Sequence, residues 1–385
     1  NIGLLLPIFS LLCSTLNRTP PLLLLPFPFA MKFRVLLVVI SLVLSVLIGT
    51  ALSRSGGTSG QAASAPGKGR RPVIGLSMDA VKEERWQRDR DYFVARAKEL
   101  GADTRVLSAN GNDTQQISDV ESLLTAGVDV VVIIAHNGDA MAKGVKLAHE
   151  SNVPVLAYDR LIRNCDLDLY VTFDNVKVGR VQAQYLVDKL AAAGKEKPKI
   201  VRLYGSRTDN NAFLFKQGQD EVLDPLIKAG KIEVIHEDWC DDWSPEAAKK
   251  IVNAAITKHG SDFDAILASA DGIAGGGIQA LREEGKTGKI MVTGQDADLS
   301  ACLRIVNGEQ TMTIYKPMKK LASLAADLAV NMATKRIVVA PDTLDNGKVQ
   351  VPSIFLEVSA ADKDSLRDTV IKDGVFTEEQ LFGKK

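Results

Sequence analysis

The chain has 385 residues, of which 46% are hydrophobic and 24% are charged, and this is the composition of an ordinary globular protein. Its 47 Lys and Arg residues balance its 47 Asp and Glu residues. A net charge of zero argues against the basic face that most nucleic-acid-binding proteins carry, so we expect no nucleic acid among the partners. The length suits two medium-sized domains.

The first 70 residues are predicted to be an export segment and a leader rather than part of the fold. A basic start at residues 31–34 precedes an apolar stretch, residues 35–48, and the small residues 49–51. This is the pattern of a secretory signal. The alternative is an uncleaved membrane anchor, because the apolar stretch continued through Leu52 is about 18 residues long, which is borderline for crossing a bilayer. We expect translation to start at Met31, with residues 1–30 a gene-model extension.

A flexible tether is predicted between the signal and the fold. Residues 53–68 are rich in Gly, Ser and Ala and show no apolar periodicity, which is typical of such a segment. The folded part is therefore expected to begin near Arg71. Export implies a periplasmic or other extracytoplasmic location, with tethering to the membrane if the apolar segment is retained.

From residue 71 onward, predicted strands alternate with predicted helices. This alternation implies right-handed crossovers and parallel sheets. More than ten strands would be many for one twisted sheet, so we predict an α/β fold with two Rossmann-like lobes. The strand-like runs that end abruptly in polar residues are 73–78, 128–134, 153–157, 200–204, 265–268, 290–293 and 311–315.

The polar clusters at the strand ends are the candidate site. In open parallel sheets, ligands bind just beyond the carboxyl ends of the strands. We therefore expect these side chains to be directed at one crevice. In chain order the clusters include Asp79, Arg85, Trp86, His136, Asn137, Asp159, Arg160, Asp209, Asn210, Asn211, Asp271, Gln295, Asp296 and Lys316.

Each cluster also has a simpler interpretation, which the residues alone leave open. Asp159 and Arg160 could form a surface ion pair at a strand end. Trp86 could be an ordinary core residue near the start of a helix. The segment 209–211 could supply only turn and N-cap chemistry. His136 is expected to be a loop residue rather than a ligand.

Motifs for catalysis, cofactors and metals are missing from the sequence. It contains no Walker A motif, no GxSxG and no GxGxxG after the first strand, and its four histidines lack metal-ligand spacing. Residues 275–277 (GGG) are expected to serve close backbone packing at a helix start. Cys13, Cys165, Cys240 and Cys302 form no CxxC and are expected to be isolated thiols. We therefore predict no catalytic residue, no cofactor and no metal site.

Several longer motifs match one known family in order along the chain. On these motifs the sequence, from about residue 73 to residue 374, resembles the bacterial periplasmic D-xylose-binding proteins, in the pentose and hexose branch of the type I solute-binding family. The motifs are ERWQ (84–87), SANGN (108–112), LAYDR (156–160), FDN (173–175), DNNA (209–212), GQDADL (294–299), QTMTIYKP (310–317) and DTVIKDG (368–374).

The resemblance implies two Rossmann-like lobes joined by a hinge of three crossings, with one sugar enclosed between them. It implies an N-terminal lobe of residues 71–176 plus 318–338 and a C-terminal lobe of residues 177–317 plus 339–385. The ligand contacts that carry over are Arg85, Trp86, Asp159 and Arg160 from the first lobe, and Asp209, Asn211, Trp243, Asp296 and Lys316 from the second.

These residue types suit a sugar. The flat rings of Trp86 and Trp243 can cover the apolar faces of a pyranose, while carboxylates accept hydrogen bonds from its hydroxyls and Arg and Lys donate to them. One position departs from the family pattern, because Ala270 stands where an asparagine contacts the sugar in the family. That departure places strict specificity for xylose in doubt.

The function implied is an exported, monomeric binding protein. It would capture a monosaccharide, with D-xylose favoured, and deliver it to an ABC transporter permease. Alternatives are a binding protein for another pentose or hexose, or a sugar-sensing partner of a chemoreceptor or sensor kinase. A transcriptional regulator would need a helix-turn-helix before residue 71, and a doubly wound dehydrogenase would need the missing phosphate-binding glycines.

Overall fold

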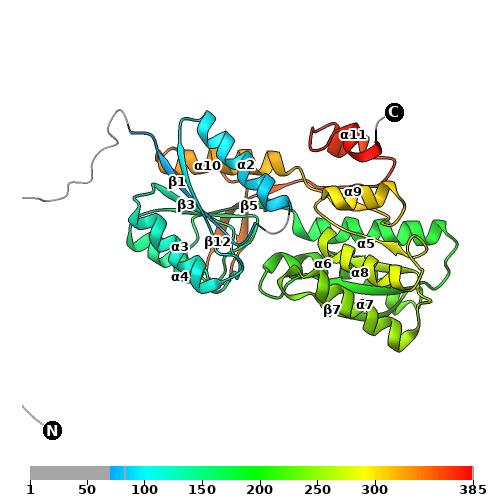
Figure 1. Ribbon diagram of the computed structural model, residues 1–385. Coiled ribbons are helices and arrows are strands. Elements are labelled where there is room, and N and C mark those ends of the chain that lie inside the picture. The colour runs from blue at the N-terminus through cyan, green and yellow to red at the C-terminus, as the bar shows by residue number, and fades with distance from the viewer. Residues whose placement is uncertain (1–69, 82–83, 384–385) are drawn as a thin grey trace, which may run out of the picture. The chain divides into compact units, whose positions relative to one another are not determined.

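The computed structural model describes residues 70–81 and 84–383 (Figure 1). The expectations for a signal, an anchor, a start at Met31 and a flexible tether, and that for Cys13, fall on residues 1–69 and lie outside the described residues. The described chain contains two mainly parallel sheets accompanied by helices, and a small antiparallel pair of strands, which confirms the predicted fold class. Within residues 70–81 and 84–383, no helix is both long and apolar enough to cross a membrane.

The first sheet has seven strands in the order β11-β12-β5-β4-β3-β1-β2. All neighbours pair in parallel except the edge strand β11, which is antiparallel to β12. The strands are β1 (Val73–Met78), β2 (Asp103–Ser108), β3 (Val130–Ile133), β4 (Val155–Tyr158), β5 (Leu169–Phe173), β11 (Asp342–Asp345) and β12 (Gln350–Leu356).

Helices cover both faces of this sheet, as the apolar strand sequences require. In β3, Val130 and Val132 belong to the core that packs against α2 and α10, whereas Val131 and Ile133 belong to the core beneath α3 and α4. Alternate residues of one short strand therefore supply two separate hydrophobic cores. The helices are α2 (Glu84–Glu99), α3 (Asp113–Thr125), α4 (Ala142–Glu150) and α10 (Met318–Ala333).

The second sheet is parallel, in the order β7-β6-β8-β9. Its strands are β6 (Lys199–Tyr204), β7 (Glu233–Trp239), β8 (Ala265–Ala268) and β9 (Met291–Val292). Near them lies a two-stranded antiparallel pair, which consists of β10 (Thr313–Tyr315) and β13 (Ser359–Ala361). The helices that accompany them are α5 (Asn175–Ala192), α6 (Asn210–Lys228), α7 (Pro245–His259), α8 (Asp271–Glu283), α9 (Leu299–Val306) and α11 (Glu378–Phe382), with short turns at Asp241–Trp243 and Arg367–Ile371.

Local sequence signals explain how these helices start and pack. Ser244 caps α7 by accepting a hydrogen bond from the N–H of Ala247, and Pro245 occupies the first turn, as expected of helix N-termini. In α8, a Cβ on Gly276 would lie 2.0 Å from the carbonyl oxygen of Pro245. Within the glycine run 275–277, Gly276 therefore serves close backbone packing, which confirms the expectation from the sequence at that position.

The chain passes between the two sheets three times. The passages are β5 to α5 at Asp174, β10 to α10 at Lys316 and Pro317, and β12 to β13 between Leu356 and Ser359. This corrects one predicted boundary, since residues 339–385 were assigned to the C-terminal lobe. The strands β11 and β12 instead extend the first sheet, and β12 pairs in parallel with β5.

Buried hydrogen bonds hold this returning hairpin on the first sheet. The side chain of Asn346, 2% exposed, donates to the carbonyl oxygens of Ile162 at 3.1 Å and Cys165 at 2.9 Å. Gly347 follows with φ +94°, a conformation that glycine adopts without strain. The hairpin is therefore fixed by contacts with residues some 180 positions earlier in the chain.

Candidate functional site

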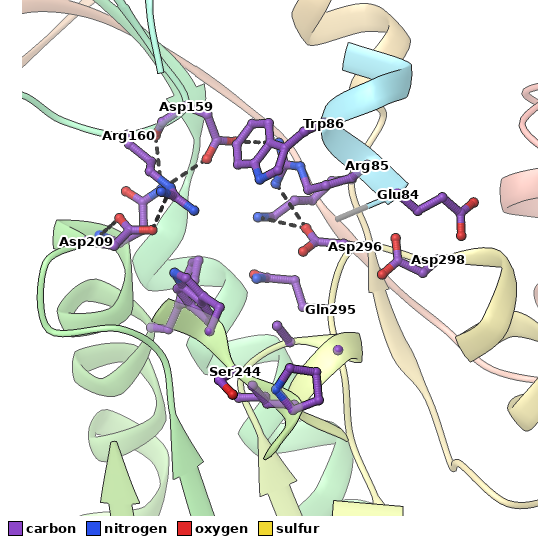
Figure 2. A pocket seen from close by; sticks show the side chains of 18 of the residues that line it. Glu84, Arg85, Trp86, Asp159, Arg160, Asp209, Ser244, Gln295, Asp296 and Asp298 are labelled. Carbon is purple, nitrogen blue, oxygen red and sulfur yellow. Dashed lines mark hydrogen bonds and ion pairs between the residues drawn. The ribbon is translucent and has the colours of Figure 1, made fainter. Parts of the chain in front are cut away.

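A cavity of about 460 Å³ lies at the carboxyl ends of strands from both sheets. This volume is in the range of small-molecule sites. All nine residues predicted as ligand contacts line it, and Figure 2 shows most of them from close by. The lining residues among the predicted set are Arg85, Trp86, Asp159, Arg160, Asp209, Asn211, Trp243, Asp296 and Lys316.

The strand order explains this convergence. In the first sheet β1 lies between β2 and β3, and in the second β6 lies between β7 and β8, so each sheet has a switch point where successive connections run to opposite sides. The start of α2 follows β1, and the start of α6 follows β6. The two switch points therefore deliver Arg85 and Asp209 to the same cavity.

Arg85 is the centre of the charged cluster. Its Nη2 donates to Asp159 at 2.8 Å, its Nη1 to Asp296 at 3.1 Å and its Nε to Asp89 at 3.2 Å (Figure 2 shows the first two partners). Asp89 also accepts a hydrogen bond from the hydroxyl of Tyr158. One guanidinium thus binds three carboxylates, and its bond to Asp296 joins the two lobes.

A second arginine makes a parallel connection. Arg160 donates through Nη1 to Asp79 at 2.7 Å, and its Nε lies 3.0 Å from Asp209 on the other lobe. The side chains of Arg160 and Asp209 are only 7% and 4% exposed. The alternative of a surface ion pair between Asp159 and Arg160 is therefore wrong, because both residues are buried and pair with other partners.

Cations and carboxylates alternate among the predicted contacts. Arg85, Arg160 and Lys316 face the carboxylates of Asp159, Asp209 and Asp296, and Lys316 Nζ lies 3.3 Å from Asp296. Further acidic residues, Glu84, Glu246 and Asp298, also line the cavity, so it has no excess of positive charge that would attract an anionic ligand. It presents donors and acceptors side by side, which is what a neutral polyhydroxylated molecule needs.

The pKa values of two of these carboxyl groups, Asp159 and Asp209, are shifted in opposite directions. Burial acts to raise the pKa of Asp159, but Arg85, Lys316 and Arg160 outweigh it and hold that pKa below its ordinary value. Burial raises the pKa of Asp209, and Arg160 only partly offsets it. Asp159 is therefore the firmer anion, because it lies against more positive charge.

Aromatic rings form the apolar part of the wall. Trp86 is 3% exposed, belongs to the first hydrophobic core and also lines the cavity, with the guanidinium carbon of Arg85 4.1 Å from its ring centroid. Trp86 is therefore a core residue that also forms part of the cavity wall, and its contact with a ligand stays a prediction. Phe215, on α6, lies with its ring centroid 6.2 Å from that of Trp243 in an edge-to-face arrangement.

Backbone strain marks the same residues. Asp159 has φ +63°, Trp243 has φ +55° and Asp296 has φ +96°. For a bulky residue such as Trp243 the left-handed conformation is a true outlier, and strain of this kind concentrates at functional sites. Three of the nine predicted residues are thus held in unfavourable backbone conformations that aim their side chains.

The segment 209–211 serves two purposes. Asp209 is the N-cap of α6 and accepts a hydrogen bond from the N–H of Asn211, so the N-cap interpretation holds. The same carboxyl group pairs with Arg160. Asn211 donates to the carbonyl oxygen of Asp159 at 3.0 Å, so this helix start also contributes to the contact between the lobes.

Asp271 supports the loop that carries Asp296. It accepts hydrogen bonds from Gln310 Nε2 at 2.8 Å, from Thr313 Oγ1 at 2.9 Å and from the N–H of Asp298 at 3.0 Å. Burial raises the pKa of Asp271 to about 7. This carboxyl group is buried beneath the site and acts through the backbone that it holds, not by lining the cavity.

Gly205 makes room for Trp243. A Cβ at position 205 would lie 2.1 Å from Cη2 of the tryptophan ring. We expect Gly205→Ala to displace that ring and to cost about 1–3 kcal/mol of unfolding free energy, measured by urea denaturation, with a weaker affinity for the ligand. Gly277→Ala is the matched control, because its Cβ would find only ordinary contacts of 3.4–3.5 Å. Equal effects of the two substitutions would contradict the steric argument.

His136 lies beside the site, outside the cavity lining. Its Nδ1 is 2.9 Å from Asp79, Asp113 and Asp242 lie near its Nε2, and Arg160 is the nearby cation. The hydrogen bond to Asp79 raises the pKa of His136, although burial opposes the shift. The expectation of a loop residue holds, since His136 follows β3 outside any strand or helix.

We expect His136→Gln to remove a pH-dependent contribution to stability. Because the pKa is raised in the folded protein, this contribution is fully present below about pH 6.5, the ordinary histidine value. It is lost as the pH rises through the raised pKa. Melting temperatures of the two proteins should therefore differ more on the acidic side than on the alkaline side. A difference independent of pH would show that His136 only packs.

Several lining residues were not among the predicted contacts. They are Glu84, Phe215, Ser244, Pro245, Glu246, Ala270, Gly272, Ile273, Gln295, Asp298 and Ser300. Gln295 was recognised in a strand-end cluster but not assigned a role. Phe215 lies one turn after Asn211 on the same helix. Because residues four apart share one face of a helix, this spacing could have indicated Phe215 as a lining residue.

The described part of the chain has three free cysteines and no cluster of metal-ligating side chains. Among residues 70–81 and 84–383, no group of His, Cys, Asp and Glu is arranged to hold a metal ion. Cys165, Cys240 and Cys302 are free and buried, as expected from the sequence. Burial raises the pKa of the Cys165 thiol to about 11, so it is a poor nucleophile.

Two parallel α/β sheets with their strand ends around one polar cavity define a two-lobed ligand-binding protein of the type I fold. The family model described as periplasmic binding protein domain matches residues 74–337. The chain therefore belongs to the periplasmic binding protein family.

Sequence and structure comparisons also identify individual proteins that are similar to this chain. The chain is 48% identical over 309 residues to the D-xylose-binding periplasmic protein of Haemophilus influenzae, covering 80% of this chain and 92% of that one. It is 46% identical over 308 residues to the protein of that name from Escherichia coli, with the same coverage of 80% and 92%. A carbohydrate transporter solute-binding protein of Chloroflexus aurantiacus, solved with D-glucose, is 31% identical with a TM-score of 0.75, covering 81% of this chain and 98% of that one.

Proposed function

We propose that this protein captures a monosaccharide, with D-xylose favoured, in the cavity between its lobes and delivers it to an ABC transporter permease. The observation that carries the proposal is the set of three cations paired with three carboxylates in a cavity walled partly by aromatic rings. Such a site suits a neutral molecule with many hydroxyl groups.

The chemistry of the hydroxyl group explains the fit. Each hydroxyl both donates and accepts, and hydrogen bonds to ionised partners are stronger than those between neutral groups. Asp159 and Asp296 can accept from the sugar while Arg85 and Arg160 donate to it. Two relatives nearly half identical to this chain carry the name D-xylose-binding periplasmic protein, which supports the choice of sugar.

The proposal includes the location and the partners. We place the protein in the periplasm as a monomer that binds sugar without catalysing a reaction, because its family consists of solute-binding proteins. Sugar would favour the lobe arrangement to which it binds more tightly, and the permease would recognise that arrangement. Retention of the apolar segment 35–48 would add a membrane tether.

A thermal-shift screen tests the proposal. D-Xylose, D-ribose, L-arabinose, D-glucose and D-galactose are each added to the purified protein, and xylose is expected to give a clear rise in melting temperature. A ligand at a hundred times its Kd stabilises by about 2.7 kcal/mol, which is readily measured. The proposed function is wrong if no pentose or hexose raises the melting temperature and calorimetry detects no heat of binding.

A further inference from the structure

The cavity has a second half that the charged cluster does not use. Its wall consists of residues outside the predicted contacts, among them Ser244, Pro245, Ala270, Gly272, Ile273 and Gln295. Figure 2 shows the Gln295 side chain reaching into the space between the charged cluster and Ser244. The half that contains Arg85 and Arg160 is extensively hydrogen-bonded. The second half contains a buried polar atom without a hydrogen-bond partner among the described residues.

Two buried polar atoms of the cavity-lining residues lack partners within the described residues, one on Gln295 in the second half and one on the predicted contact Trp243. Gln295 is 2% exposed, and its Oε1 accepts no hydrogen bond there. The indole Nε1 of Trp243 is likewise buried without an acceptor among the residues described. Leaving such groups unpaired in a buried site is unfavourable. A hydroxyl group can satisfy both kinds of atom, because it donates and accepts.

The start of α8 adds donors and space beside Gln295. Its N-cap residue is Ala270, which offers no side-chain cap. The N–H groups of Gly272 and Ile273, in the first turn, have no acceptor within the helix. A Cβ on Gly272 would meet only one atom within 4 Å, the Cγ of Pro245 at 4.0 Å, so the space beside this helix end is open.

The size of the cavity limits what this second half can hold. The whole cavity measures about 460 Å³, near the lower end of the range for small-molecule sites. The second half is continuous with the charged half, so a substituent of the bound sugar can reach it.

We propose that the second half of the cavity is a subsite for the exocyclic hydroxymethyl group of an aldohexose. The inference rests on the proposed function, and it makes D-glucose a ligand alongside D-xylose. The methylene group packs against Ala270 and Pro245. The hydroxyl donates to Gln295 Oε1 and accepts from an N–H of Trp243 or of the first turn of α8.

Three sugars isolate this group. D-Glucose is D-xylose with a hydroxymethyl group on C5, and 6-deoxy-D-glucose keeps the carbon but lacks the hydroxyl. Calorimetry of the full chain should show that glucose binds about tenfold more tightly than 6-deoxyglucose, as expected for one buried hydrogen bond. In Gln295→Met that ratio should fall to about one, whereas in the control Gln184→Met, at an exposed site on α5, it should not change.

A second variant tests the space rather than the hydrogen bond. Ala270→Leu fills the subsite and should lower the ratio of glucose affinity to xylose affinity by at least about tenfold. Ala191→Leu, at an exposed position, is the matched control and should leave that ratio as it is. Melting of each variant without sugar shows whether it is folded.

The outcomes separate the two proposals. If the protein binds neither xylose nor glucose, the proposed function fails and the subsite fails with it. If it binds xylose but not glucose, the subsite alone is wrong. Equal affinity for glucose and 6-deoxyglucose, or an unchanged ratio in Gln295→Met, would also overturn the assignment of the hydroxyl.

Discussion

Replacing Arg85 by methionine is expected to abolish sugar binding and to cost the free protein roughly 3–5 kcal/mol of unfolding free energy. Arg85 is 5% exposed and donates to Asp89, Asp159 and Asp296. Methionine keeps the length and apolar stem of the side chain but leaves these buried carboxylates without their shared cation. Uncompensated buried charge is the reason for the large effect.

Two measurements check this prediction. Urea denaturation gives the loss of stability, and calorimetry with D-xylose gives the loss of affinity. Arg90→Met is the matched control, because Arg90 lies on the same helix with its side chain 36% exposed and pairs only with Asp91 in the described structure. Surface pairs contribute about 0–1 kcal/mol, so the control should be nearly neutral. Comparable losses in both variants would contradict the central role of Arg85.

Removing single partners of the sugar is expected to have the second-largest effect. Asp159→Ala, Arg160→Ala and Asp296→Ala should each lower the sugar affinity by about 2–4 kcal/mol, since each removes one partner of a buried, charged hydrogen bond. Asp159 and Arg160 are 3% and 6% exposed overall, so their hydrogen bonds are shielded from bulk solvent.

Titration calorimetry with D-xylose measures these losses directly. Asp91→Ala serves as the control, because its side chain is 66% exposed on the outer face of α2. The free energy of unfolding should be determined in parallel, so that lost affinity is separated from lost folding. Unchanged sugar affinity in all three site variants would overturn the site as a whole.

The sequence indicated part of the cavity lining, because strand ends are local signals. An apolar run that stops at a charged residue can be read from a few neighbouring positions, and parallel sheets bring such positions to one edge. For this reason Asp159, Asp209, Asp296 and Lys316 could be predicted as cavity residues from the sequence alone. Their roles as sugar contacts remain predictions.

Features that depend on distant pairing could not be predicted. The strand β11 is mostly exposed and polar, and β12 alternates only partly, so neither has a strong period. Their place in the first sheet depends on pairing with β5 and on the buried amide of Asn346. The left-handed backbone of Trp243 is equally invisible in the sequence, because nothing around it signals a positive φ.

Lys316 lies on one of the three passages between the lobes and also lines the cavity. It is 2% exposed, pairs with Asp296, and has its ammonium group 5.3 Å from the ring centroids of Phe173 and Phe215. Under the proposed function, a sugar that contacts Lys316 touches one of the three segments about which the lobes would move. Binding of the sugar would then act directly on a segment that connects the lobes, without intermediate residues. Substitutions of Lys316 would therefore change both the affinity for the sugar and the rate of its release.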